Sequence, residues 1–162
     1  MTRIIPYILY FWLIAMHQVI LKDVTSIFGI SINLAVLIIV LATFYKSELV
    51  VCWFSFLIGL IAYTADFHII GWQVVMMVII GFIAFHIKEK LNLDSLYAKL
   101  LLIFGGVLFH NIISLVLSNS DQFFYLFLSK AITGAIYTTI IAWFFFLFKE
   151  GKITFQKFKS IF

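Results

Sequence analysis

The sequence predicts an all-α integral membrane protein with six membrane-spanning helices joined by short loops. Hydrophobic residues make up 65% of its 162 residues and charged residues only 11%, whereas a typical soluble domain carries roughly 25% charged residues. Long apolar runs recur with only a few polar residues between them, which is typical of membrane spans. The alternative, a very oily soluble helical bundle, would have to hide more apolar surface than a chain of this length can bury.

The first three spans are predicted over Ile4–Leu21, Ile32–Tyr45 and Leu49–Ala65. The first could be taken for a signal peptide, but no small-x-small cleavage site follows it, so we interpret it as a span. Lys46-Ser47-Glu48 closes the second. The third is short, because about 1.5 Å per residue barely crosses a hydrocarbon core of about 30 Å. If the second or third is re-entrant, the number of spans changes.

The last three spans are predicted over Gly71–Ile87, Leu96–Leu117 and Phe123–Phe148. Asp66-Phe67-His68 forms the turn before the fourth span. The cluster Lys88-Glu89-Lys90 follows that span and has to lie in water. We therefore divide the chain into a six-span bundle, 1–148, and a basic amphipathic tail, 149–162. In this tail three phenylalanines form an apolar stripe with lysines beside it, which predicts an interfacial helix.

The lysines and arginine define an orientation. With the spans as predicted, nine of the eleven basic residues fall on one face: Arg3, Lys46, Lys88, Lys90, Lys99, Lys149, Lys152, Lys157 and Lys159. Positive-inside bias places this face, with both termini, in the cytoplasm. The formal net charge of +4 therefore indicates membrane topology and anionic lipids rather than nucleic acid. The single Cys52 excludes an internal disulfide.

Polar residues within the predicted spans are costly unless they pair, so each is a candidate. Lys130 lies about two turns into the sixth span, where it either extends toward the outer surface or pairs with Asp66 or Asp121. The adjacent His110 and Asn111 would need hydrogen bonds to other helices.

Small residues and one turn complete the candidates. The pair Gly105-Gly106 lets another helix approach closely. The small residues around Gly59 and Gly134 predict packing faces, within the bundle or toward a partner's single span. Asp66 and His68 could ligate a metal, but two ligands favour a turn, so we predict no metal and no cofactor.

Catalysis has no sequence support. The chain has no His-Glu-x-x-His pair for zinc, no Gly-x-Ser-x-Gly nucleophile elbow and no phosphate-binding glycine loop. Its serines, histidines and aspartates have no local arrangement that would activate a nucleophile. The sequence therefore predicts a protein that is not an enzyme.

A set of short motifs occurs along the chain: Asn33, Gly59, Ile70-Gly71 with Gln73, Lys88-Glu89-Lys90, Leu91-Asn92-Leu93-Asp94-Ser95, Gly105-Gly106 and His110. With these motifs nearly the whole chain resembles the MreD family, the small membrane subunit of the bacterial rod-shape machinery (the elongasome). The chain departs from the pattern at Ile32 (proline in the family), at Tyr63 (acidic), and at Thr133 and Thr138 or Thr139 (asparagine and proline).

This resemblance implies a non-catalytic scaffold for cell shape in the bacterial cytoplasmic (inner) membrane. Such a scaffold would bind the single-span protein MreC. It would help to connect MreB filaments to RodA and its penicillin-binding transpeptidase during peptidoglycan elongation of the cell wall. The residues that would serve structure or this partner interface are Asn33, Gly59, Asp66, Gly71, Gln73, Asp94, Gly105, His110, Asn111 and Lys130.

Two alternatives remain open at this point. The first is the substrate-binding S component of an energy-coupling-factor vitamin transporter, which is similar in size and number of spans. That class resembles a bundle with an Ala-x-x-x-Ala face on its first span, where this chain has bulky residues and only Ala15. The second is an ion or proton pathway along the polar residues inside the spans.

Overall fold

The computed structural model describes residues 5–17, 25–26, 29–64, 68–91, 95–118 and 122–149, and every regular element in these ranges is a helix. The elements are α1 (Ile5–Met16), α3 (Leu34–Thr43), α4 (Glu48–Ala62), α5 (Ile70–Lys90), α6 (Leu96–Leu117), α7 (Phe123–Leu126), the π-helical turn η2 (Phe127–Ile132) and α8 (Thr133–Lys149). The candidates Asp66 and Asp94, the possible partner Asp121, and the tail after Lys149 lie outside these ranges.

Three helices are long and apolar enough to cross a membrane: Ile70–Lys90, Leu96–Leu117 and Phe123–Lys149, the last of which joins α7, η2 and α8. These helices indicate a membrane protein. The predicted second and third spans form apolar but shorter helices of 10 and 15 residues, or about 15 and 22 Å. Helix α3 begins later than predicted because Asn33 caps it, its side chain accepting a hydrogen bond from the Val36 N–H.

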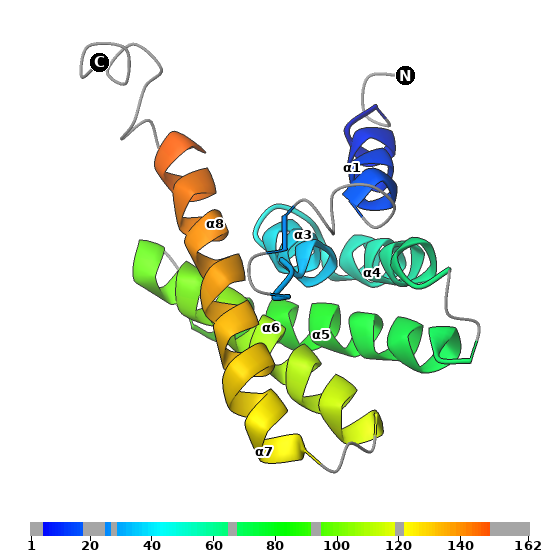
Figure 1. Cartoon of the computed structure of the whole chain (residues 1–162). Coiled ribbons are helices and arrows are strands. Elements are labelled where there is room, and N and C mark those ends of the chain that lie inside the picture. Colours follow the sequence, from blue (N-terminus) through cyan, green and yellow to red (C-terminus); the bar gives the residue numbers. More distant parts are fainter. Residues whose placement is uncertain are drawn as a thin grey trace.

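Helix α3 forms the centre of the core. Its residues from Ala35 to Val40 are all buried, which explains why this stretch shows no amphipathic periodicity: a helix that is apolar all round is surrounded on every side. Figure 1 shows α3 in the middle of the molecule, with α4 and α5 on one side and α8 on the other. The longer helices therefore pack around a short central one.

Helices α4 and α5 approach most closely at glycines. A Cβ atom on Gly59 would lie 3.0 Å from the Val74 Cα, and one on Gly81 would collide with the Ser55 Oγ. Small residues at both points let the two backbones come together, as is common between membrane helices. The predicted packing role of Gly59 is confirmed, within the bundle.

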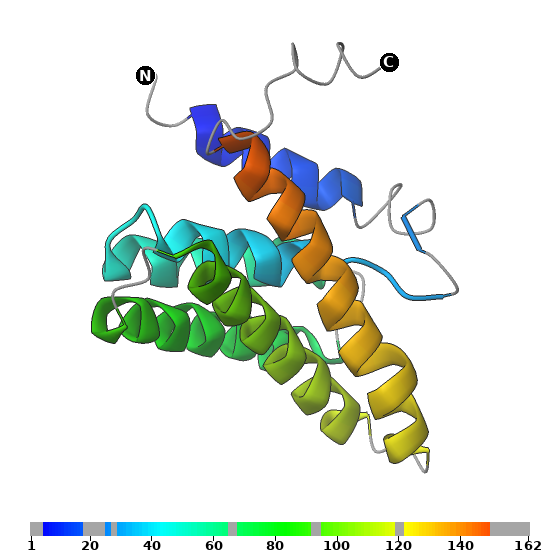
Figure 2. The ribbon, with the colours of Figure 1, turned by 90° about the vertical axis from the view of Figure 1, so that its left-hand side faces the viewer.

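Successive helices alternate in direction, so the molecule has two distinct ends (Figure 2). We call one the basic end, because five of the six lysines in the described ranges lie there: Lys46, Lys88, Lys90, Lys99 and Lys149. Ring contacts hold this end together across helices, with the Lys149 Nζ 3.4 Å from the Tyr45 ring centroid and the Lys99 Nζ 5.7 Å from that of Phe146. Lys130, near the start of the last helix, lies toward the opposite end.

Candidate functional site

A hydrogen-bonded group of polar side chains lies between the helices at the end opposite the basic end. We call it the amide cluster; its members are Asn33, Tyr63, Gln73, His110, Asn111, Ser114 and Thr138. Four of them, Asn33, Gln73, His110 and Asn111, were candidates from the sequence. His110, Gln73 and Thr138 are buried, so their polar groups need partners inside the protein.

His110 is the hub of the cluster. Its Nδ1 lies 2.9 Å from the amide nitrogen of Asn33, which can only donate. Its Nε2 lies 3.2 Å from the Gln73 Oε1, which can only accept, and 2.9 Å from the Tyr63 hydroxyl. The two shortest amide contacts are satisfied when Nδ1 accepts from Asn33 and Nε2 donates to Gln73; the Asn111 Oδ1 lies farther from Nδ1, at 3.4 Å.

Further bonds extend the cluster to other helices. The Gln73 Nε2 donates to the Ser114 Oγ over 3.4 Å, and the Asn33 backbone N–H donates to the Thr138 Oγ1 over 3.1 Å. The Asn111 Nδ2 donates to the carbonyl oxygen of Ala131, 3.1 Å away in the π-helical turn η2. The hydrogen bonds to other helices that the pair His110-Asn111 predicted are therefore confirmed.

The cluster joins helix ends that are far apart in sequence. It connects the N-cap of α3, the C-terminal end of α4, the first turn of α5, the second half of α6 and the last helix. Its described members are amides, hydroxyls and one imidazole, each hydrogen-bonded to another member. Such a network favours a fixed helix arrangement, because polar side chains in an apolar medium are stabilised by pairing.

The sequence did not single out three members of the cluster. Ser114 lies one turn after His110, so helical spacing could have identified it. Tyr63 and Thr138 have no comparable local signal. They join the network from α4 and α8, Tyr63 through its hydroxyl on His110 and Thr138 through its hydroxyl on the Asn33 backbone N–H.

A polar pocket of about 360 Å³ opens beside the cluster. Asn111 and Ser114 contribute to its wall together with Ser31 and Ser118, and the exposed Lys130 also lines it. Lys130 makes no ion pair within the described ranges. Its predicted alternatives stay open there, since both proposed acidic partners fall outside them.

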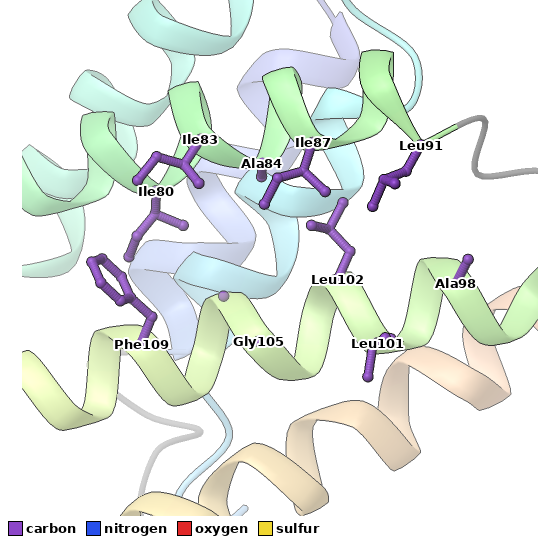
Figure 3. A pocket seen from close by; sticks show the side chains of 11 residues that line it. Ile80, Ile83, Ala84, Ile87, Leu91, Ala98, Leu101, Leu102, Gly105 and Phe109 are labelled. Carbon is purple, nitrogen blue, oxygen red and sulfur yellow. The ribbon is translucent and has the colours of Figure 1, made fainter.

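A second cavity, about 420 Å³ in volume, is an apolar groove between α5 and α6. Figure 3 shows Ile80, Ile87 and Leu91 pointing from α5 toward α6, and Leu102 and Phe109 pointing back. Its further lining residues are Ile83, Ala84, Ala98, Leu101, Gly105 and Gly106. We call it the α5–α6 groove.

The two adjacent glycines of α6 have different surroundings. A Cβ atom on Gly106 would lie 3.2 Å from a Val40 methyl group of α3, whereas one on Gly105 would meet nothing within 4 Å. Gly71, at the start of α5, is similarly open. Close approach of a helix to Gly105 is therefore possible but is not used within the described bundle.

In the part of the chain that the structure describes, no three histidine, cysteine, aspartate or glutamate side chains gather as metal ligands. His68 is exposed, and its neighbour Asp66 lies outside the described ranges. The comparisons with known proteins give no assignment: no family model, no curated protein and no solved structure matches this chain.

Proposed function

We propose that this chain is a non-catalytic membrane scaffold whose α5–α6 groove holds the single membrane-spanning helix of a partner. The observation that carries this proposal is Gly105, a helical glycine on an apolar groove, where an added Cβ atom would meet nothing within 4 Å in the described part of the chain. Both walls of the groove belong to helices long enough to cross a membrane. In lipid, helices associate by close packing at small residues, so this surface suits an apolar helix.

The resemblance to the MreD family leads us to propose MreC as that partner. The chain would then act in the bacterial cytoplasmic membrane, where it would support peptidoglycan elongation by RodA and its transpeptidase and link them to MreB filaments. The amide cluster supports a scaffold role, because it holds the helices around the groove in one arrangement.

The proposed topology has six spans, with both termini and the basic end in the cytoplasm. The gathering of five described lysines at one end supports this orientation. The short α3 is compatible with it, since α3 lies inside the bundle, where non-helical flanking backbone is tolerated at membrane depth. A cysteine in place of Glu89, in a Cys52→Ser background, would resist an impermeant maleimide in intact cells and react after lysis. Labelling in intact cells would reverse the orientation.

The test of the partner is affinity purification from native membranes in mild detergent, with mass spectrometry of the captured proteins. The wild-type chain is expected to capture MreC and the elongation proteins. Gly105→Leu, which fills the groove, should lose them. Gly71 is also an interface candidate by the resemblance, but it is an equally open glycine that does not line the groove, so Gly71→Leu should keep them if the groove is the interface. Equal capture by both variants would exclude the groove as the interface.

A second candidate function is the S component of a vitamin transporter, favoured by the polar pocket that Lys130 lines. Cofactor-sized sites combine a cavity of roughly 300–1,000 Å³ with a few convergent polar groups, and this pocket has both. The same purification distinguishes the two functions. If the chain is an S component, a coupling-factor ATPase pair would be recovered instead of elongation proteins. Tight vitamin binding by the purified chain, lost in Lys130→Ala, would also decide for the transporter.

A further inference from the structure

A third cavity lies between α1, α3 and α8, with α3 as its floor and α1 and α8 as its walls. Its volume is about 450 Å³. Leu34, Leu37, Ile38 and Leu41 come from α3, Tyr10 and Leu13 from α1, and Ile141 and Phe145 from α8. Figure 1 shows α1 and α8 standing on either side of α3. We call this cavity the α1–α8 groove.

This groove is apolar along its length and basic at one end. Lys46, after α3, and Lys149, the last residue of α8, both line it at the basic end of the molecule. Both lysines are exposed, and the Lys149 ammonium rests on the Tyr45 ring. Two acidic residues are near these lysines in sequence: Glu48, which lines a different surface with Cys52 and Trp53, and Glu150, which follows Lys149 and lies outside the described residues.

We propose that the α1–α8 groove binds one anionic phospholipid, with an acyl chain between α1 and α8 and the phosphate between Lys46 and Lys149. The pattern of an apolar channel ending in two cations matches an amphiphile with an anionic head. In the proposed topology, on which this inference rests, the basic end faces the cytoplasm. Basic pockets between membrane helices on that side recognise such heads, and that leaflet is the anionic one.

The three-sided shape and the charge distinguish this groove from the α5–α6 groove. The latter has two walls, no charged side chain in its lining and an open glycine, which suit a helix. The α1–α8 groove already has helices on three sides and two aromatic residues, Tyr45 and Phe145, beside its cations. An apolar groove that is lined by several helices and has two lysines at one end suits a flexible acyl chain with a phosphate better than a helix.

The test uses the full chain purified in mild detergent, titrated with phosphatidylglycerol or phosphatidylcholine of the same acyl chains, with native mass spectrometry as the readout. Phosphatidylglycerol is expected to remain bound one per chain, and phosphatidylcholine is not. The variant Lys46→Gln with Lys149→Gln should bind roughly 25-fold more weakly, since each lysine contributes roughly fivefold near an anionic lipid. Equal retention of the two lipids would overturn the proposal.

Two further variants make the result specific to this groove. Lys88→Gln with Lys90→Gln removes the same charge from the basic end without touching the groove and should leave binding unchanged; an equal loss would show general attraction only. Leu13→Trp, on the exposed side of α1, should block the acyl chain while both lysines remain. Inorganic phosphate in excess should not displace the lipid, and displacement would reduce the site to a phosphate site. If cross-linking in the native complex captures a protein segment in the α1–α8 groove, the occupant is that segment and the lipid proposal is wrong.

Discussion

Helix α5 faces α4 on one side and α6 on the other, and the two interfaces differ in kind. Toward α4, glycines at 59 and 81 bring the backbones into direct contact, and no space for another side chain is left. Toward α6, the hydrogen bonds of Gln73 with His110 and Ser114 join the helices at one end, and an open groove with Gly105 in its lining lies along the rest.

The difference shows that a small residue in a membrane helix does not always mark close packing within the same chain. Gly81 is needed by this chain, because nothing larger fits against Ser55. Gly105 is not required for packing among the described helices, because an added Cβ atom there would meet nothing within 4 Å. A glycine of the second kind costs helix stability, by roughly 0.5–1 kcal/mol relative to alanine, without a return inside the bundle. This supports a role in contact with another molecule.

The largest expected effect is from Gly81→Leu. Its side chain would have to displace Ser55 and Val51 of α4 and Ile39 of α3 together, and overpacking of this kind costs about 3 kcal/mol or more. We expect loss of monodisperse protein in detergent, measured by size-exclusion chromatography and thermal unfolding. Gly105→Leu is the control and should behave as wild type. A stable Gly81→Leu protein would mean that α4 and α5 are not in close contact.

The next effect concerns the bonded end of the α5–α6 interface. His110→Ala removes partners from Asn33, Tyr63 and Gln73. Three hydrogen bonds of about 0.6 kcal/mol each in membrane proteins predict a loss of about 2 kcal/mol. Unfolding by sodium dodecyl sulfate in mixed micelles measures it. His86→Ala is the matched control, since the His86 ring hydrogen-bonds to the Phe82 carbonyl and contacts the Phe82 and Phe85 rings, all within its own helix. Equal losses of stability would mean that the amide cluster does not stabilise the bundle more than a contact within one helix does.

How far the sequence predicts this arrangement depends on how local each feature is. Ser95 is followed by an apolar run, and α6 begins at Leu96 as predicted, because the Ser95 hydroxyl caps it. The adjacent His110 and Asn111 had to find partners in other helices, and they do. These features follow from the chemistry of neighbouring residues.

Other features depend on how helices are rotated against each other. Two adjacent glycines in α6 point about 100° apart, so only the packed structure shows that Gly106 meets α3 and Gly105 faces the groove. The apolar run around α3 predicts a longer helix, but the run does not show that Asn33 is drawn to His110 and Thr138 and caps α3 there. The π-helical turn that presents the Ala131 carbonyl to Asn111 has no local signal either.

Replacement by alanine, a smaller change, should alter the free energy of unfolding in opposite directions at the two kinds of glycine. Gly59→Ala places a Cβ atom 3.0 Å from backbone of α5, so we expect a loss of about 1–3 kcal/mol. Gly105→Ala meets nothing and gains helix propensity, so we expect a stabilisation of about 0.5–1 kcal/mol. Detergent unfolding of both variants under one condition measures the pair. The same sign for both would remove the distinction between the two interfaces.

The last expected effect comes from a polar atom that the close α4–α5 contact leaves unsatisfied among the described residues. The Ser55 Oγ is buried and has no hydrogen-bond partner in the described part of the chain, and an unpaired buried polar group costs at least about 1 kcal/mol. Ser55→Ala is therefore expected to stabilise the protein by about 1 kcal/mol. Because the Oγ is also the atom nearest to a Cβ at position 81, Gly81→Ala should cost less in the Ser55→Ala background than alone. The double-mutant cycle should give a coupling energy of at least about 0.5 kcal/mol, as is usual for residues in contact. Strictly additive effects would mean that Ser55 and Gly81 are not in contact.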